Sequence, residues 1–155
     1  MDIVLEKFKR LPFSTILAAR NYGMDNIAVP SDARLGSKLC MAILRGDNRE
    51  MSDLLSAGAP MDHREEPDGW TPLIYSIYYG NNRARQELIA RGADIAQGDY
   101  ADRTPLMFAA IKGDTALVNE LLSLGADRNA RDARGKSAGD FAKEYLRDEC
   151  ANLLK

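Results

Sequence analysis

The sequence predicts an all-α solenoid of stacked helix pairs, because one pattern of residues returns at a constant spacing. Residues 69–80 read GWTPLIYSIYYG, and residues 102–113 read DRTPLMFAAIKG. Thr71 aligns with Thr104 and Gly80 with Gly113, an offset of 33 positions in both cases. A fixed period of this size indicates supersecondary units that stack on one another. A single unit cannot bury its own apolar faces, so the fold depends on contacts between neighbours.

Each repeat carries the signals for two short helices. Thr71 can cap a helix, and Pro72 fits its first turn because the N–H groups there have no intrahelical partner. Gly80 permits the left-handed conformation that ends the helix. A second apolar stretch ends at Gly92, and residues 93–103 then lead to the next unit as an extended finger.

The repeat resembles the ankyrin repeat, whose T-P-L-H-x-A signature and period of 33 it follows. The resemblance covers about residues 35–155 and implies four stacked helix pairs. The units expected from it are about 35–65, 66–98, 99–131 and 132–155. The chain departs from the family at Ile74 and Met107, where a histidine usually ties the finger to the helix. We therefore expect the turns to be less rigid than is usual in the family.

Residues 1–34 do not follow the period. Two short apolar stretches precede the first repeat, and Pro12 is suited to start the second of them. We expect residues 1–34 to form an N-terminal helical cap, because the end of a stack needs a solvated outer face. A partner-specific arm is the alternative.

Composition limits the class of protein. A chain of 155 residues that is 45% hydrophobic can form one domain with a continuous core. A net charge of −2 argues against nucleic-acid binding through bulk charge, and no apolar run is long enough to span a membrane. Cys40 and Cys150 lie about three units apart, too far for a disulfide within one chain. We therefore expect a reduced, cytoplasmic monomer with two free thiols.

Two segments could carry chemistry. Residues 130–137 nearly match the P-loop pattern, but Ala130 replaces its first glycine, and the pattern works only between a strand and a helix. Nucleotide binding through Gly135, Lys136 and Ser137 is kept as an alternative. His63, the only histidine, is expected to be an exposed loop residue, because a metal site would need further ligands at suitable spacing. We expect no metal, no cofactor and no catalysis.

Arg85 stands where the neighbouring units have Met51 and Val118. Burying a guanidinium is costly, so we expect its stem to lie on the helices and its head to reach water. An ion pair with Glu87 or with a neighbouring helix is the alternative.

The aromatic residues indicate a binding surface. Tyr75 and Phe108 share one repeat position and are expected in the core. The resemblance places a further set of residues on the concave groove and fingers: Trp70, Tyr78, Tyr79, Tyr100 and Ile111, with Asp68, Arg103, Lys112, Arg134 and Lys136 as neighbours. Trp70, Tyr79 and Tyr100 are expected at its centre, because tryptophan and tyrosine dominate binding hot spots. The alternative, for one or two of them, is packing between adjacent units.

The resemblance implies a non-catalytic module that binds another protein, as an inhibitor or an adaptor. A bacterial immunity protein that neutralises a toxin or effector is an alternative within the same resemblance. The first finger is mainly acidic and the last mainly basic, which would orient a partner along the groove.

Overall fold

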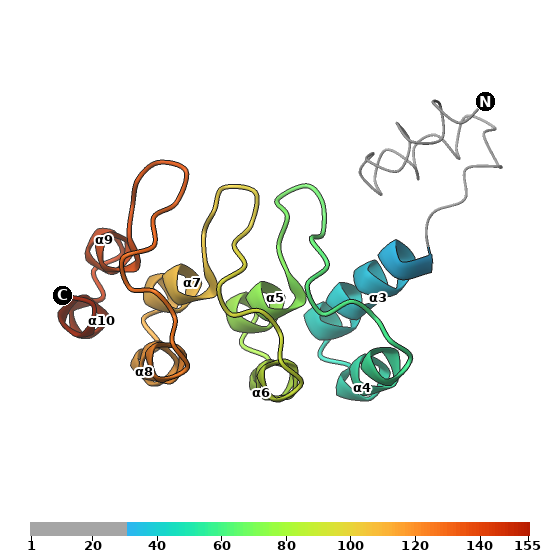
Figure 1. Cartoon of the computed structure of the whole chain (residues 1–155). Coiled ribbons are helices and arrows are strands. Elements are labelled where there is room, and N and C mark those ends of the chain that lie inside the picture. The colour runs from blue at the N-terminus through green and yellow to red at the C-terminus, as the bar shows by residue number, and fades with distance from the viewer. Residues whose placement is uncertain (1–30) are drawn as a thin grey trace, which may run out of the picture.

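The computed structural model describes residues 31–155, and eight α-helices run through this part of the chain in four antiparallel pairs (Figure 1). The pairs are α3 (Ser31–Arg45) with α4 (Asn48–Ser56), α5 (Pro72–Tyr78) with α6 (Asn82–Ala90), α7 (Pro105–Lys112) with α8 (Thr115–Ser123), and α9 (Ala138–Glu144) with α10 (Asp148–Leu153). The predicted all-α repeat fold is confirmed. The predicted cap lies outside the described residues as far as residue 30, and α3 begins at Ser31.

The helices begin and end where the repeat signals predict. Thr71 Oγ1 accepts a hydrogen bond from the N–H of Ile74 at 3.3 Å, which caps the first turn of α5. Asp114 does the same for α8, accepting from the N–H of Leu117 at 2.9 Å. Gly113 ends α7 with φ 75°, a left-handed conformation that favours glycine.

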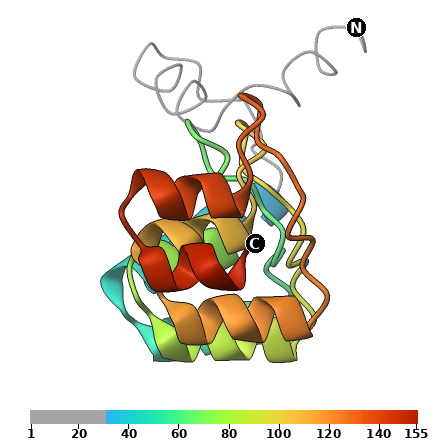
Figure 2. The ribbon, with the colours of Figure 1, turned by 90° about the vertical axis from the view of Figure 1, so that its left-hand side faces the viewer.

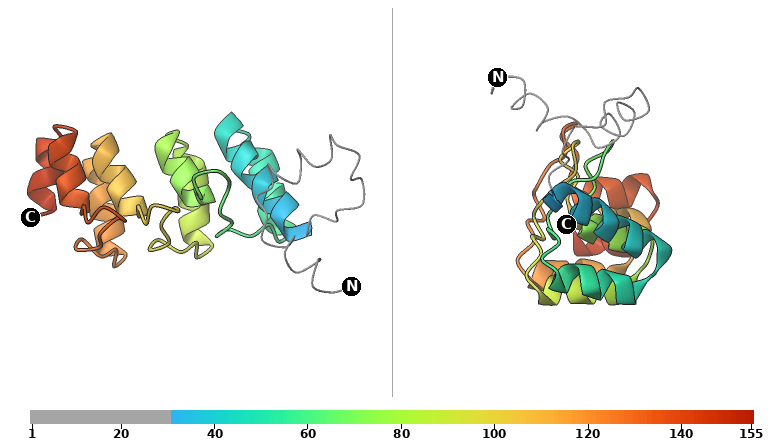
Figure 3. Two further views of the ribbon diagram at one scale, coloured as in Figure 1. Left: turned by 90° about the horizontal axis from the view of Figure 1, so that it is seen from above. Right: turned by 90° about the vertical axis from the view of Figure 1, so that its right-hand side faces the viewer.

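The core is continuous along the stack. Buried side chains run from Leu39 in the first pair to Leu154 at the end of the last. The pairs follow one another in a row when seen from above (Figure 3), so each unit has a neighbour against which to bury its apolar face. Cys40 and Cys150 are both free and buried, as expected, and burial raises the pKa of each thiol.

Three fingers connect the pairs, at residues 57–71, 91–104 and 124–137. Seen along the stack, they rise beside the row of first helices α3, α5, α7 and α9, while α4, α6 and α8 lie beyond that row (Figure 2). Fingers and first helices therefore share one side of the molecule.

Arg85 corrects one expectation. Its side chain is only 12% exposed, so the head group does not reach water. Nη1 donates to Asn82 at 2.9 Å, and the guanidinium lies 3.9 Å from Asp114 and 3.8 Å from Glu120. Both carboxylates belong to the next unit, which confirms the alternative of a neighbouring helix. Arg85 makes no ion pair with Glu87, whose carboxylate accepts from Arg91 and Ser52 instead.

Candidate functional site

The predicted site residues lie on the side of the stack shared by the first helices and the fingers. We call the surface formed by Trp70, Tyr78, Tyr79, Ile111 and Lys112 the inner face. Its residues sit before and at the end of α5 and at the end of α7. The inner face is therefore built on two neighbouring helices of the stack, which hold it in a fixed arrangement.

Trp70 forms the base of the inner face. Its ring centroid lies 5.6 Å from that of Tyr75, 4.7 Å from that of Tyr78 and 5.4 Å from that of Phe108. Phe108 belongs to the following unit and is 2% exposed, so Trp70 packs between two units. Ile111 is also partly buried against the core. The alternative of packing between units thus describes Trp70, whereas Ile111 is shown only to pack against the core.

Tyr78 and Tyr79 are the exposed part of the inner face. Their side chains are 41% and 50% exposed, although each ring contacts another ring. Tyr78 meets Tyr79 edge-on at 5.2 Å, and Tyr79 stacks on Tyr75 at 6.0 Å. Such ring pairs restrict side-chain freedom before any partner arrives. The result is a rigid aromatic surface that remains open to solvent.

Lys112 adds a positive charge beside these rings. Its Nζ lies 5.6 Å from the centroid of Tyr78, within the range of a cation–π interaction. Lys112 is exposed and makes no ion pair with any described residue. The other predicted cations differ: Arg103 pairs with Asp99 at 2.6 Å, Arg134 with Asp132 at 3.4 Å and Lys136 with Glu144 at 2.5 Å.

Tyr100 lies apart from the inner face and joins two fingers. Its ring covers Gly69, where a Cβ atom would lie 2.5 Å from the ring. The backbone N–H of Tyr100 donates to the carbonyl oxygen of Asp68 at 3.0 Å, and its hydroxyl donates to Glu66 at 2.9 Å. Burial and the Glu66 carboxylate raise the pKa of Tyr100. The side chain is still 51% exposed, so it both fixes the first finger and offers surface.

Two buried aspartates stabilise the fingers, and they are absent from the predicted site. Asp99 is fully buried and accepts from the backbone N–H of Arg103 at 2.9 Å and from its Nε at 2.8 Å. Asp132 accepts from the N–H groups of Arg134 and Lys136 at 2.9 and 2.8 Å. The signal was present, because Asp99 and Asp132 are 33 positions apart.

These bonds have an electrostatic consequence. Burial alone would raise the pKa of Asp132, but the N–H donors of Lys136 and Arg134 hold it below its usual value. Asp99 therefore supplies hydrogen bonds within the finger before Met107, and Asp132 within the finger before Asp140; the finger before Ile74 has Glu66 at this position. In the last unit Asp140 takes the position of the family's usual histidine and accepts from the N–H of Ser137 at 2.9 Å. Carboxylate hydrogen bonds thus tie the second and third fingers, where the family's histidine is absent.

His63 corrects another expectation, since it is not an exposed loop residue. Its side chain is 16% exposed and packs on Gly36 of α3, where a Cβ atom would lie 2.3 Å from its ring. Nε2 lies 2.9 Å from Glu65 and 3.4 Å from Ser37. Burial favours the neutral form of Glu65, but the bonds from His63 and Ser37 lower its pKa overall. This cluster connects the first finger to α3.

The described residues provide no suitable site for binding a nucleotide or a metal ion. Gly135, Lys136 and Ser137 lie on a finger between α8 and α9, with no strand before them. The carboxylate of Asp132 already takes the N–H groups that a phosphate would need. Residues 31–155 contain no group of three potential metal ligands and no helix that could span a membrane.

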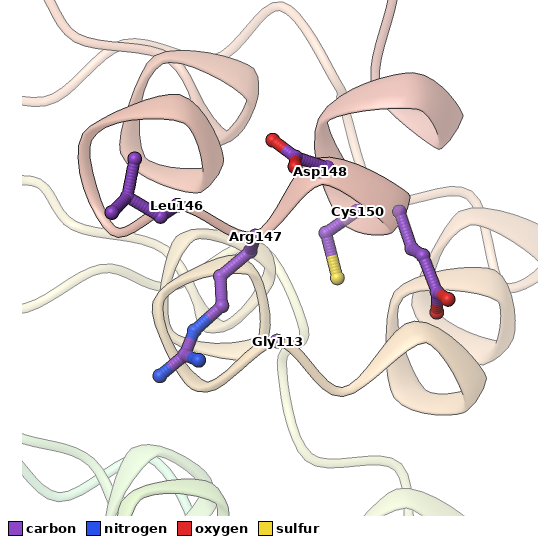
Figure 4. Close-up of a pocket in the computed structure, with 6 residues that line it drawn as sticks. Gly113, Leu146, Arg147, Asp148 and Cys150 are labelled. Atoms are coloured by element: carbon purple, nitrogen blue, oxygen red, sulfur yellow. The ribbon is translucent and has the colours of Figure 1, made fainter.

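A hollow of about 330 Å³ lies at the other end of α7 from the fingers. Figure 4 shows Arg147 extending past Gly113 while Leu146 points in a different direction. Arg147 Nε donates to the carbonyl oxygen of Ile111 at 3.2 Å, so this cation stabilises the C-terminal end of α7. Cys150 lines the hollow, but burial and the nearby Asp114 and Glu149 raise its pKa. The thiol is therefore a poor nucleophile.

Comparisons with known proteins agree with the fold. A family model described as ankyrin repeats, three copies, matches residues 39–132. Human ankyrin repeat and SOCS box protein 11 is 33% identical over 124 residues, which are 80% of this chain and 38% of that protein. Chicken inversin is 26% identical over 124 residues, 11% of its length. An ankyrin repeat-containing protein of Treponema pallidum (strain Nichols) is 28% identical over 118 residues, 40% of its length.

The chain thus spans less than half the length of each of these relatives. Their similarity covers the repeats, and ankyrin repeats are in general modules for binding other proteins. The period, the helix pairs and the family match lead to the same conclusion: this chain belongs to the ankyrin-repeat family.

Proposed function

We propose that the chain is a non-catalytic binding module that holds a partner protein against the inner face and the fingers, as an inhibitor or an adaptor. The observation that carries the proposal is the exposure of Tyr78 and Tyr79. Two adjacent tyrosines that are 41% and 50% exposed leave a large aromatic surface in water. Tyrosine is among the residues that contribute most to protein interfaces.

The surroundings of these tyrosines favour tight binding. Trp70 and Tyr75 lie behind them and restrict their motion, so little side-chain entropy is lost when a partner docks. Lys112 has no carboxylate partner among the described residues and can pair with an acidic group of the partner. The partner surface that fits is therefore apolar at its centre, with a carboxylate beside it.

Charge on the fingers would set the orientation of that partner. The first finger presents Asp62 and Asp68 to solvent, and the last presents Arg128, Arg131 and Arg134. Complementary charges on a partner would favour one direction of docking and speed association more than they would tighten the complex. We infer that the protein acts in the cytoplasm as a monomer, and its two free thiols agree with a reducing compartment.

The proposal can be tested in two steps. Affinity capture from the source organism identifies a partner, and its identity separates an inhibitor or immunity protein from an adaptor. Calorimetry then compares the parent chain with Tyr79→Ala and Tyr145→Ala. Tyr145 is the matched control, because it occupies the same repeat position two units later and is 48% exposed, but contacts no aromatic ring among the described residues.

We expect Tyr79→Ala to weaken binding about thirtyfold, equivalent to about 2 kcal/mol, and Tyr145→Ala to change it little. Circular dichroism must first show that both variants fold. Folded variants that both bind like the parent would place the site elsewhere, on the other side of the helices or in residues 1–30.

A further inference from the structure

Within the stack, each unit uses one position of its first helix to contact the unit before it. Tyr75, Phe108 and Phe141 share this position. Phe108 contacts Trp70 of the preceding unit at 5.4 Å and is 2% exposed. Burial raises the pKa of Tyr75 to about 12, and Cys40 in the preceding unit adds to this rise. Phe108 and Phe141 are therefore buried at this position, and Tyr75 is partly buried.

The second helices make a corresponding polar contact. Glu87 in α6 accepts from Ser52 in α4 at 2.8 Å, and Glu120 in α8 lies 3.8 Å from Arg85 in α6. Glu87 and Glu120 occupy the same repeat position, 33 residues apart. Each of these carboxylates thus reaches back to a donor in the preceding unit.

The first unit has both positions but lacks both contacts. Met41, which is 34 positions before Tyr75, is 46% exposed. Asp53, which is 34 positions before Glu87, is exposed, and its carboxylate makes no hydrogen bond or ion pair with any described residue. Helices α3 and α4 form the end of the described stack (Figure 1). This end presents an apolar side chain and an acceptor without their usual partners.

We propose that residues 1–30 of the same chain cover this end of the stack, with apolar side chains on Met41 and a basic group at Asp53. The segment leads directly into α3 at Ser31, so its local concentration at this surface is about millimolar. It contains the apolar residues and the charge that the two positions require. These are Ile3, Val4, Phe8, Ile16 and Leu17, and the basic run Lys7, Lys9 and Arg10.

Residues 1–30 precede α3 in the same chain, so they reach this end without the loss of translational freedom that binding a second copy would cost. Cations of the run would give Asp53 the kind of partner that Arg85 gives Glu120 one unit further on. The apolar residues would give Met41 the cover that Trp70 gives Phe108. The segment would then replace a preceding repeat in both of its contacts.

Oxidation of Met41 tests the apolar contact in the full-length chain. Dilute hydrogen peroxide converts exposed methionine to the sulfoxide, which peptide mass spectrometry measures at each position. We expect Met41 to oxidise at least tenfold more slowly in the native chain than in the chain unfolded in urea. Fully buried Met51 serves as the protected reference. Phe8→Ser with Leu17→Ser should restore rapid oxidation of Met41 and leave Met51 protected.

Carbodiimide cross-linking tests the polar contact in the parent chain, without any substitution. We expect a bond between the carboxylate of Asp53 and the amine of Lys7 or Lys9, and Asp53→Asn should abolish it. Asp127, an exposed carboxylate on the last finger, is the control that should not cross-link to either lysine.

The competing occupants give different results. A mixture of isotopically light and heavy chains would show links between chains if a second copy covers the end, and that result would overturn the proposal. Rapid oxidation of Met41 in the native chain would overturn it as well. Slow oxidation that is unchanged by Phe8→Ser with Leu17→Ser would assign the cover to something other than residues 1–30.

Discussion

The contrast between Leu121 and Leu124 is the most direct test of the repeat register. Both leucines lie near the end of α8, three positions apart. Leu121 is fully buried in the continuous core, whereas Leu124 caps the helix and is 48% exposed. Leu121→Ala and Leu124→Ala therefore remove the same atoms from opposite environments.

The expected losses follow from burial. Removing three carbon atoms from the core costs about 0.8 kcal/mol each, or about 2.4 kcal/mol for Leu121→Ala. Neighbours on two sides of α8 restrict collapse, so a residual cavity of about 40 Å³ adds about 1 kcal/mol. The total is about 3.4 kcal/mol. Leu124→Ala loses about half of the transfer energy and leaves no enclosed cavity, so we expect about 1 kcal/mol.

Equilibrium unfolding in urea, followed by circular dichroism, measures both free energies of unfolding. The slope of free energy against urea should be the same in the two variants, because a change in slope would indicate that single units unfold separately. Equal losses for Leu121→Ala and Leu124→Ala would contradict the register, and so would a loss below 1 kcal/mol at Leu121.

Three further predictions concern the fingers and the thiols. Tyr100→Phe removes only the hydrogen bond to Glu66 and should cost about 1 kcal/mol in urea unfolding, whereas Tyr100→Ala should cost more; equal costs would mean that the ring does not hold the first finger. Asp132→Asn should lower the melting temperature at pH 7, and the melting temperature should then fall less steeply as the pH drops below about 5. The reason is that a carboxylate with a lowered pKa stabilises the fold above its ordinary pKa and loses that effect as it is protonated. Unchanged acid melts would contradict this. Cys40 and Cys150 should react slowly with Ellman's reagent in the native chain and fully in urea; fast native labelling would contradict their burial.

The sequence predicts the fold well because the fold is repetitive. Helix starts at Thr71 and Thr104, and helix stops at Gly80 and Gly113, depend on local backbone chemistry that each residue carries by itself. The repeat then places most core positions, since a unit buries the same face as its neighbour; Arg85 and the partly buried Tyr75 are departures. Local signals and the stack agree, and only residues 1–30 fall outside what the structure describes.

The errors concern side chains whose surroundings come from another unit. Arg85 was expected to reach water, but Asp114 and Glu120 of the next unit hold its head group near the helices. His63 was expected in solvent, but Gly36 of α3 leaves room for its ring. A repeat pattern predicts only contacts that recur in every unit, and these two contacts occur once each. Both depend on a side chain that meets a small or oppositely charged residue of another element.

The predicted site residues illustrate the same limit. Sequence position placed Trp70, Tyr79 and Tyr100 together, but the structure gives each a different environment. Trp70 packs between units, Tyr100 joins two fingers, and Tyr79 alone of the three lies exposed over a stacked ring. Exposure of a large side chain has to be read from the structure, because it depends on what the neighbouring unit covers.

This difference decides how binding data on the three residues must be interpreted. Truncating Trp70 removes a contact with Phe108 of the next unit, so weaker binding could result from a shifted third unit. Truncating Tyr100 removes the hydrogen bond to Glu66 and the ring over Gly69, so it loosens the first finger even though the backbone bond to Asp68 remains. Tyr79 contacts only Tyr75 and Tyr78 among the described rings, both within its own helix, so its removal disturbs no other unit. A loss of affinity confined to Tyr79→Ala would therefore report on the partner contact itself, whereas losses at Trp70 or Tyr100 also report on the stack that presents it.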